Sequence, residues 1–406
     1  MTKIPIPKQV KSLCSIISTS SSNGEARIVG GYVRDFLSGR MPKEIDMATN
    51  LTPDVIMKIC ETNGLKAIPT GLSHGTVTVL VSGISIEVTT LRIDVECNGR
   101  HAEVLFTNNW EEDARRRDFT INALYADDDG NLYDYFNGIN DLKSKTIRFI
   151  GNPEDRIHED YLRIMRYFRF LGYFEYSEEI QLDQNSFAAA AKLATNLKKI
   201  SIERIRDELM KTFGSKSPQV PIKLMQQSGI FEKIGLKIKN VANLRFCTDP
   251  IINLAAILKT SAYTDLKILE QFKFSKKDQR TIHTLISVDF SYVFENIHNN
   301  ISNGKVNFDE VHCCMQKFGK ESYIQLFKMY SVINPSSIGK LLLDDFINSL
   351  ESVKMKEFPI KGNDVVNLGF EGPEIKQAMS KGKDIWIESN CNLSKEEILD
   401  LLKKQK

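Results

Sequence analysis

Near its N-terminus this chain of 406 residues reads Ile28-Val29-Gly30-Gly31-Tyr32-Val33-Arg34-Asp35, and Glu44-Ile45-Asp46 follows soon after. A short apolar run enters a glycine pair, and the chain then turns into a segment that carries an arginine and an acid. Because glycine has no Cβ, the backbone amides of the pair can approach a polyphosphate closely, and the N-terminus of a following helix favours negative charge. Taken alone, the stretch fits either a phosphate site or an ordinary glycine turn.

Glu44 and Asp46 stand one residue apart at the start of a new extended segment. Carboxylates at positions i and i+2 of a strand point to the same side, where together they can hold a hard divalent cation. The alternative is a solvated acidic loop, because such pairs are common in turns. Glu87 adds a third carboxylate on the alternating run Ile84–Leu91, unless it is only the polar face of a strand. Converging carboxylates are what two-metal nucleotidyl transfer requires.

The composition is that of an ordinary globular protein, with 42% hydrophobic residues. No run of about 18 apolar residues is present, so we expect no transmembrane helix. The first residues, Met1–Gln9, lack the apolar core of a signal peptide, so we expect a cytoplasmic protein. The net charge is only +2, so a polyanionic partner must be met by local basic patches. The seven cysteines, including the adjacent Cys313-Cys314, have neither disulfide-framework nor zinc-site spacing.

The pattern of the chain changes near residue 150. Before this point, short β-rich runs alternate with turn residues, which predicts a compact α/β region. The predicted strands are Ala26–Val29, Gly75–Val81, Ile84–Leu91, Ala102–Phe106 and Leu132–Phe136. After this point, apolar residues recur at spacings of three and four, which predicts helices. The predicted helices are Asp160–Leu171, Ile202–Phe213, Pro221–Ile230, Ile251–Leu258 and Ser394–Leu402.

Two groups of arginines stand out among the charged residues. Arg115, Arg116 and Arg117 follow one another between carboxylates. Guanidinium groups match phosphate oxygens in pairs, so these arginines either grip phosphates or form ion pairs on a helix surface. A second group recurs at three-residue intervals, which predicts one charged side of a helix: Asp160, Arg163, Arg166 and Arg169.

Several motifs together, in their order and spacing, resemble the class II tRNA nucleotidyltransferases of the polymerase β-like superfamily. This family includes CCA-adding enzymes, and bacterial poly(A) polymerases are close relatives. The match is dense from about residue 27 to 210, weak from 215 to 355, and recovers near 358 to 400. The motifs are Gly30-Gly31-x-Val33-Arg34-Asp35, Glu44-x-Asp46-x-Ala48-Thr49, Arg116–Ala123, Arg156–Phe170, Ser201–Leu209 and Lys361–Gly369.

The resemblance implies an α+β fold, in which an N-terminal nucleotidyltransferase head with a small mixed sheet precedes an all-α neck, body and tail. The implied parts are a catalytic head (1–145), a neck that selects the nucleotide base (146–214), a helical body (215–355) and a tail that binds tRNA (356–406). In the neck, Ser201–Leu209 resembles a bracing helix, so we expect its charges to be structural.

The implied activity is addition of CCA to the 3′ end of tRNA from CTP and ATP, with Mg²⁺ as cofactor and pyrophosphate released. The implied catalytic residues are Glu44, Asp46 and Glu87, of which Glu44 and Asp46 bind the metal. The implied nucleotide-binding residues are Gly30, Gly31, Arg34, Arg116, Arg117, Asp118, Asn122, Asp160, Arg163, Arg166 and Arg169. No membrane and no obligatory protein partner is expected.

Within that set, the resemblance makes Asp160 and Arg163 a protein template for the base. A carboxylate can accept a hydrogen bond from an exocyclic amino group, and a guanidinium can donate to ring nitrogen or carbonyl acceptors. Cytosine and adenine both present an amino donor beside an acceptor nitrogen. This predicts acceptance of CTP and ATP and rejection of UTP and GTP.

The sequence departs from the family at Glu44, where the family usually has aspartate. Octahedral magnesium tolerates misplaced ligands poorly, so we expect Glu44 to preserve metal binding at some cost in rate. The polar segment Arg92–Asn109, which includes Asp94, Gly99 and Arg100, is expected to form the flexible loop that switches the family's pocket from CTP to ATP. A surface hairpin without this role is the alternative.

Three other functions stay open. An enzyme that adds only part of CCA differs from a full CCA-adding enzyme by a few loop residues. A poly(A) polymerase would be expected to end in a long basic tail. An RNA-binding homologue that lost catalysis through Glu44 belongs to a different functional class.

Overall fold

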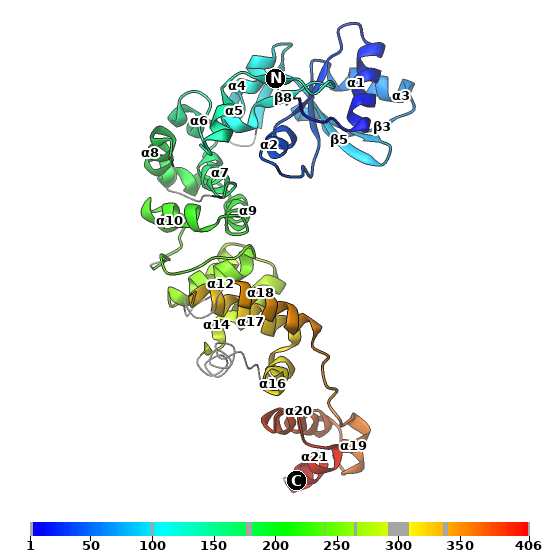
Figure 1. Cartoon of the computed structure of the whole chain (residues 1–406), viewed down its shortest axis with the longest axis vertical. Coiled ribbons are helices and arrows are strands. Elements are labelled where there is room, and N and C mark those ends of the chain that lie inside the picture. The colour runs from blue at the N-terminus through cyan, green and yellow to red at the C-terminus, as the bar shows by residue number, and fades with distance from the viewer. Residues whose placement is uncertain are drawn as a thin grey trace. The chain divides into compact units, whose positions relative to one another are not determined.

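The computed structural model describes residues 3–98, 101–175, 181–239, 241–263, 266–290, 308–335 and 340–404. The chain divides into two compact units, Met1–Leu236 and Lys237–Lys406. Figure 1 shows the sheet within the first unit and helices throughout the second, which confirms the predicted α+β fold. The finer division into head, neck, body and tail stays a prediction.

The first unit is built on a mixed sheet of seven strands in the order β3-β4-β5-β2-β1-β8-β9. All neighbouring strands are antiparallel except β2 and β5, which are parallel. The strands are β1 (Ala26–Val29), β2 (Asp46–Thr49), β3 (Lys66–Gly71), β4 (Thr76–Val81), β5 (Ile84–Thr90), β8 (Leu124–Ala126) and β9 (Leu132–Asp134).

The position of each strand in the sheet follows from its residues. All four residues of β1 are buried, as expected for a short apolar strand near the middle of a sheet. β3, at the edge, is mostly exposed and carries a lysine and a proline, which suit an edge strand. The sequence analysis named β1, β4, β5 and β9 within a few residues, whereas it missed β3 and β8, which have no run of alternating apolar residues.

The glycine pair lies where β1 turns into helix α2 (Gly31–Leu37). Gly30 has φ +67°, a conformation that side chains other than glycine rarely adopt. A Cβ on this residue would lie 3.4 Å from a guanidinium nitrogen of Arg117. Glycine is therefore needed for the turn, whereas a Cβ would only touch the arginine at about the ordinary contact distance.

A two-stranded ribbon stands in place of the loop expected after Leu91. Strands β6 (Arg92–Asn98) and β7 (His101–Phe106) pair antiparallel, with Arg92 opposite Phe106. Strand pairing satisfies the backbone polar groups of a segment that has few apolar anchors, which polarity alone did not reveal. The prediction of a loop was therefore wrong in its local structure. Gly99 and Arg100 lie outside the described residues.

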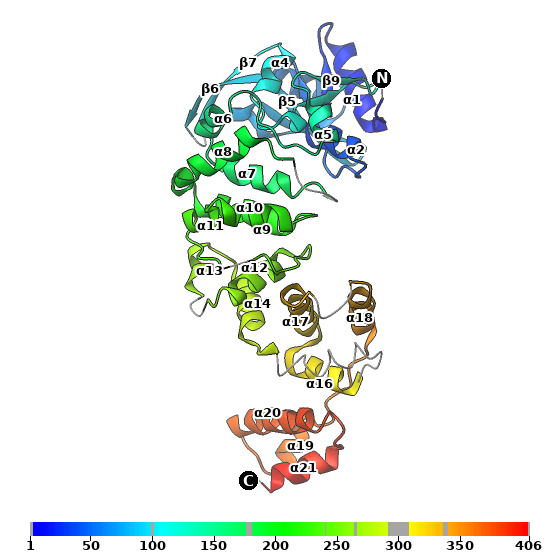
Figure 2. The same cartoon turned by 60° about the vertical axis from the view of Figure 1, so that its left-hand side comes forward.

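Helices complete the first unit, and α7 to α11 lie beyond the sheet (Figure 2). They are α1 (Lys8–Ser20), α2, α3 (Pro53–Thr62), α4 (Trp110–Arg115), α5 (Gly138–Lys143), α6 (Pro153–Glu159), α7 (Leu162–Leu171), α8 (Gln184–Leu193), α9 (Ile202–Phe213), α10 (Gln219–Gln227) and α11 (Ile230–Lys233). The predicted helix Pro221–Ile230 is wrong at its end, because Gly229 has φ +67° and separates α10 from α11.

Asp160 does not lie on a helix, contrary to the sequence analysis. It has φ −149° and separates α6 from α7, and its Oδ1 accepts a hydrogen bond from the backbone N–H of Leu162 at 3.0 Å. Aspartate commonly occupies such a position because its side chain satisfies an N–H that the first turn leaves unpaired. Ile164, Phe168 and Leu171 of α7 are buried, as predicted.

The second unit is helical in its described part. Its helices are α12 (Pro250–Thr260), α13 (Lys267–Gln271), α14 (Lys276–Ser287), α16 (Phe308–Phe318), α17 (Lys320–Ile333), α18 (Lys340–Ser352), α19 (Gly362–Asn367), α20 (Pro373–Glu388) and α21 (Lys395–Lys403). One of its apolar clusters joins residues of α16, α20 and α21, including Cys313, Trp386 and Ile398. Over the described residues, no helix is long and apolar enough to cross a membrane.

Candidate active site

A polar cavity of about 690 Å³ opens in the first unit, next to the glycine pair. All of the predicted site residues except Glu87 line it, so residues from β2, α2, α7 and the segments between them meet at one place. Arg92 and Phe170 line it as well, although neither was predicted as a site residue. The predicted residues in the lining are Gly30, Gly31, Arg34, Glu44, Asp46, Arg116, Arg117, Asp118, Asn122, Asp160, Arg163, Arg166 and Arg169.

Three acidic residues form what we call the carboxylate corner: Glu44, Asp46 and Glu87. Asp46 is the first residue of β2, whereas Glu44 precedes the strand. The parallel register of β2 and β5 sets Asp46 directly beside Glu87, at a spacing of about 4.8 Å between strands. Burial, and then the negative charge of Glu87, raise the pKa of Asp46, while Arg117 acts in the opposite direction.

The chemistry of the carboxylate corner fits a divalent cation. Within the described part of the chain, neither a hydrogen bond nor an ion pair neutralises these three side chains. Oxygen donors with unneutralised negative charge are the ligands that hard cations prefer. However, no three acidic, histidine or cysteine side chains among the described residues form a ready-made metal cluster. The predicted convergence of three carboxylates is therefore not seen, since Glu87 is exposed on β5 and lies outside the cavity lining.

Six arginines also line the cavity, and together we call them the arginine wall: Arg34, Arg116, Arg117, Arg163, Arg166 and Arg169. Each is held by a carboxylate, in four separate pairs and one shared arrangement. Arginine side chains that are fixed in this way lose little conformational entropy when an anion binds, so the wall is prearranged for phosphate.

Asp113 is the residue that the sequence analysis missed and that organises two of these arginines. It is 1% exposed, and its Oδ1 accepts a hydrogen bond from Arg116 Nε at 2.8 Å. Its Oδ2 accepts from the Tyr125 hydroxyl at 2.7 Å and from Arg117 Nη2 at 3.2 Å. Its position three and four residues before the arginines, on one helix face, is the signal that could have found it.

The charge of Asp113 is stabilised by this environment. Burial alone would raise its pKa, but the guanidinium groups of Arg117 and Arg116 and the Tyr125 hydroxyl lower it to about 2. One negative charge thus faces two positive charges. The pair of arginines keeps a net positive charge that is available to a bound anion. The backbone N–H of Arg92, at the start of the ribbon, also donates to Asp113 Oδ1 at 3.3 Å.

Asp118 fixes two arginines of the arginine wall, Arg166 directly and Arg34 through Asn122. Its Oδ1 accepts hydrogen bonds from Asn122 Nδ2 and from the Phe119 backbone N–H, both at 2.9 Å, and its Oδ2 accepts from Arg166 Nε at 2.8 Å. Burial opposes ionisation, but Arg166 and Asn122 lower the pKa of Asp118 to about 2. Asn122 Oδ1 in turn accepts a hydrogen bond from Arg34 Nη1 at 2.7 Å. Asp118 and Asn122 therefore hold arginines in place.

Asp160 and Arg163, the predicted template pair, lie at the junction of α6 and α7. Besides capping α7, the Asp160 carboxylate pairs through Oδ2 with Arg204 of α9 at 2.9 Å. Arg163 Nη1 donates to Glu159 Oε2 at 2.6 Å and to the Arg156 carbonyl at 2.8 Å. Both side chains are thus oriented before any base arrives.

Helix α9 braces α7, which agrees with the structural role expected for its charges. Glu208 is 5% exposed, and its Oε2 accepts a hydrogen bond from Arg169 Nε at 2.5 Å. The ring of Phe170 lies under three arginines of the wall, with the guanidinium carbon of Arg169 at 4.2 Å from the ring centre. Phe170 was not predicted because its role depends on these contacts across the fold.

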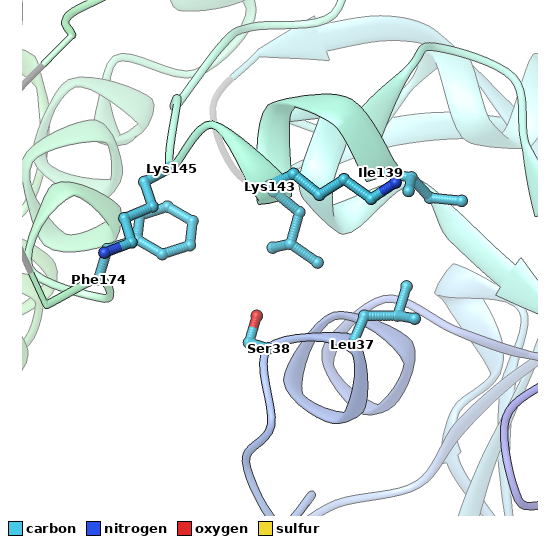
Figure 3. Close-up of a pocket in the computed structure, with 7 residues that line it drawn as sticks. Leu37, Ser38, Ile139, Lys143, Lys145 and Phe174 are labelled. Carbon is cyan, nitrogen blue, oxygen red and sulfur yellow. The ribbon is translucent and has the colours of Figure 1, made fainter. Parts of the chain in front are cut away.

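A second, smaller cavity of about 180 Å³ lies between α2 and α5 (Figure 3). Leu37 and Ser38 approach it from α2, and Ile139 and Lys143 from α5. Its lining shares no residue with the polar cavity and includes none of the predicted site residues. It is mainly apolar, and the polar cavity is the one that combines carboxylates with arginines.

Two family models match the first unit. Residues 26–148 match the poly A polymerase head domain. Residues 179–238 match a model described as the probable RNA and SrmB-binding site of polymerase A, which begins after α7 and includes α8 to α11. The head-domain match spans the sheet, the glycine pair and the carboxylate corner. It also includes three arginines of the wall: Arg34, Arg116 and Arg117.

The whole chain is similar to known proteins. It is 35% identical to CCA tRNA nucleotidyltransferase 1, mitochondrial, of Danio rerio, over 93% of this chain and 87% of that protein. It is 33% identical to a CCA-adding enzyme of Lactobacillus johnsonii, over 88% of this chain and 89% of that protein. Its fold is similar to that of the Bacillus stearothermophilus CCA-adding enzyme solved with CTP, with a TM-score of 0.78 and 24% identity over 98% of this chain and 97% of the other. The chain belongs to the family of CCA tRNA nucleotidyltransferases.

Proposed function

We propose that this protein adds C, C and A to the 3′ end of tRNA, taking CTP and ATP as substrates and using no nucleic-acid template. The observation that carries this function is the single polar cavity in which an arginine wall faces a carboxylate corner. Such a cavity offers cations to a triphosphate and oxygen ligands to a metal at the same place.

Glu44 and Asp46 would hold Mg²⁺, with Glu87 beside Asp46 as a weaker third carboxylate. When bound, Mg²⁺ would lower the pKa of the attacking hydroxyl and neutralise charge on the triphosphate. Burial, and then the negative charge of Glu87, raise the pKa of Asp46, and a bound cation would oppose both effects. Magnesium is proposed because oxygen ligands beside a triphosphate are its usual setting in proteins.

The arginine wall would hold the triphosphate. Arg116 and Arg117 share one carboxylate, so this pair has spare positive charge, and Arg163 likewise shares Glu159 with Arg156. Arg34 lies on the first turn of α2, where the backbone amides of Gly30 and Gly31 are close to the cavity. Together these residues would orient the α-phosphate toward the carboxylate corner.

Asp160 and Arg163 would select the base. A carboxylate has about four lone-pair positions, and hydrogen bonds to Leu162 and Arg204 use two of them, so Asp160 can still accept from an amino group. Arg163 keeps nitrogen atoms that can donate to a ring acceptor. The fixed directions of these groups would favour cytosine and adenine over uracil and guanine.

The reaction forms one bond and breaks another at the α-phosphorus. The 3′-hydroxyl oxygen of tRNA bonds to that phosphorus, the bond to the β-phosphate oxygen breaks, and pyrophosphate leaves. The residues of this chain bind and orient the triphosphate, and they exclude the wrong bases. A cytoplasmic location stays a prediction, and the similar proteins of Danio rerio, Mus musculus and Homo sapiens are named mitochondrial.

The function is tested with tRNA that lacks CCA, magnesium, and each of the four labelled nucleotides separately and in combination. We expect two additions with CTP alone, a third with CTP and ATP together, and none with UTP or GTP. Repeated addition of AMP would identify a poly(A) polymerase. A stop after two cytidines would identify a partial enzyme, and absence of any addition would favour an RNA-binding protein.

A further inference from the structure

Two cysteines that are far apart in the sequence meet inside the second unit. Cys313 lies on α16 and Cys391 lies between α20 and α21, and their sulfur atoms are 3.2 Å apart. The two residues are 6% and 4% exposed. They belong to the same apolar cluster as Trp386 and Ile398. The contact therefore connects α16 directly to the C-terminal helices.

The backbone after α20 holds Cys391 in this position. Asn390 and Cys391 have φ +59° and φ +54°, a region that residues other than glycine rarely adopt. The N–H of Cys391 donates to the carbonyl of Trp386 at 2.9 Å, and the N–H of Asn390 donates to that of Ile387 at 3.0 Å. These bonds end α20 in a tight turn, and the turn keeps the Cys391 side chain within the cluster.

We propose that Cys313 and Cys391 form an oxidation site, at which a two-electron oxidant such as hydrogen peroxide converts the two thiols to a disulfide. A disulfide has a sulfur–sulfur distance of about 2.05 Å, so the two sulfurs need to approach by roughly a further 1 Å. Small rotations of the two cysteine side chains supply this movement without a rearrangement of the helices.

Peroxide would oxidise the two thiols in two steps. One sulfur, as its thiolate, attacks a peroxide oxygen, which gives a sulfenic acid and, after proton transfer, one water. The second sulfur then attacks the sulfenic sulfur, the sulfur–oxygen bond breaks, and the second water leaves. The thiols lose two electrons and two protons, and the peroxide takes up both. Because the second sulfur is already in contact with the first, the second step needs no large movement of the backbone.

Among the cysteines whose side chains the structure describes, the four outside this pair have surroundings that disfavour this chemistry. Cys314 is next to Cys313 but points about 100° away around α16 and is half-buried. Burial, with the nearby charges of Asp128 and Asp127, raises the pKa of Cys14 to about 12. Burial also raises the pKa of Cys60 and of Cys247. These thiols are expected to stay reduced under conditions that oxidise the pair.

The disulfide would close a loop from Cys313 to Cys391 and fasten α19, α20 and α21 to α16. Cross-links that close long loops stabilise a fold, chiefly by restricting the unfolded chain. The unfolding temperature of the second unit should rise by about 5 °C. Low exposure of both sulfurs predicts that oxidation is slow, on the timescale of local opening.

The test uses the full chain, treated with hydrogen peroxide, then unfolded and alkylated, and mapped as peptides without reduction. We expect one cross-linked peptide pair that joins Cys313 to Cys391, lighter than the two reduced peptides by two hydrogen atoms and separated by dithiothreitol. Full alkylation of both cysteines after oxidation, or a cross-link that uses Cys314, would overturn the proposal.

Variants supply the matched comparison. Cys391→Ser and Cys313→Ser should each lose the cross-link and the rise in unfolding temperature, whereas Cys314→Ser should keep both. If Cys314→Ser loses the cross-link, the assignment to Cys313 is wrong. If Cys391→Ser does not fold, the peptide map of the unsubstituted protein decides the question by itself.

Discussion

Glu44 and Asp46 of the carboxylate corner line the same cavity as the arginine wall, but the protein treats the charges of the two regions in opposite ways. Every arginine of the wall is paired with a carboxylate. Arg116 and Arg117 pair with Asp113, and they help to lower the pKa of this carboxyl to about 2. Over the described residues, no cation is paired with the carboxylate corner, and the pKa of Asp46 is raised. Carboxylates of the protein itself thus pair with the arginines of the wall, whereas the described residues supply no cation that pairs with the corner. From this difference we infer that the wall positions a ligand and propose that the corner needs a metal ion.

Among variants that keep Asp46, the largest expected effect is at Glu44, whose carboxylate has no hydrogen bond or ion pair within the described residues. Glu44→Ala should slow CMP addition by at least about 100-fold, because a ligand to the cation is lost. Glu44→Asp should keep or exceed the original rate, since a shorter carboxylate is the usual residue of the family. Single-turnover addition of labelled CMP to tRNA lacking CCA measures both.

Glu61→Ala is the control for Glu44, because Glu61 is an exposed acid on α3 away from the cavity. It should leave the rate unchanged. A sharp drop for Glu44→Asp would contradict the view that Glu44 is a compromise ligand.

The next effect concerns base selection by the wall. Asp160→Ala should reduce the preference for CTP over UTP by about 10- to 100-fold, because a hydrogen bond that distinguishes the bases is lost. Arg204→Ala should reduce it less, since Arg204 only holds Asp160 in place. The ratio of kcat/KM values for the two nucleotides is the measurement.

Arg206→Ala, on the same helix as Arg204, is the matched control. Arg206 pairs with the neighbouring Asp207 at 2.7 Å and does not line the cavity. It should leave the nucleotide preference as it is. An unchanged preference in Asp160→Ala would show that these residues are not the template.

A smaller effect is expected where a buried carboxylate holds the wall. Asp113→Asn should raise KM for CTP about tenfold, because Arg116 and Arg117 lose charge-assisted hydrogen bonds. The value of kcat should change much less, since the carboxylate corner is untouched. Steady-state kinetics with varied CTP separates the two constants.

The control for Asp113 is Glu111→Gln on the same helix. Glu111 also pairs with an arginine, Arg115, at 2.7 Å, but both side chains are at least half exposed. It should change neither constant. An equal fall in kcat in Asp113→Asn, with KM unchanged, would mean that Asp113 does not act through triphosphate binding.

The smallest effect is on stability at acid pH. Because the folded pKa of Asp113 is about 2 and its ordinary value is 3.8, its contribution is present above about pH 4 and is lost as the pH falls toward 2. The free energy of unfolding of the first unit should lose about 2 kcal/mol from this residue over that range. Urea unfolding at several pH values should therefore show a weaker dependence for Asp113→Asn. If the free energy of unfolding fell equally with pH in the original protein and in Asp113→Asn, the lowered pKa of Asp113 would be contradicted.

Local sequence predicted the parts of the site that depend on local geometry. The sequence predicted the glycine turn at Gly30, Asp46 at the start of β2, and the arginines at three-residue spacing on α7, because each follows a fixed backbone pattern. Glu44 was expected on the same strand but precedes it. Asp160 was misplaced on the helix, since spacing alone does not show whether an aspartate lies inside a helix or caps it. Of the ribbon, β7 was predicted as a strand, whereas β6 was assigned to a loop, because polar strands have little apolar alternation.

The contacts that hold the wall could not be read from the sequence. The pair of Asp118 with Arg166 joins residues 48 positions apart, and the pair of Asp160 with Arg204 joins residues 44 apart. Such contacts depend on how α7 packs against α9 and against the segment that carries Asp118, which periodicity does not specify. The same is true of Phe170 and Tyr125, whose side chains pack against or bond to arginines that come from other elements.

The central claim is that the arginine wall binds the triphosphate and the carboxylate corner supports transfer. It is tested most directly at Asp46. The measurement compares CTP binding without added metal and single-turnover CMP addition with magnesium, in the original protein and in Asp46→Asn. We predict that Asp46→Asn binds CTP within a few-fold of the original affinity, because the arginine wall is intact, and transfers no CMP. Retained transfer in Asp46→Asn, or loss of metal-free CTP binding together with transfer, would contradict this account.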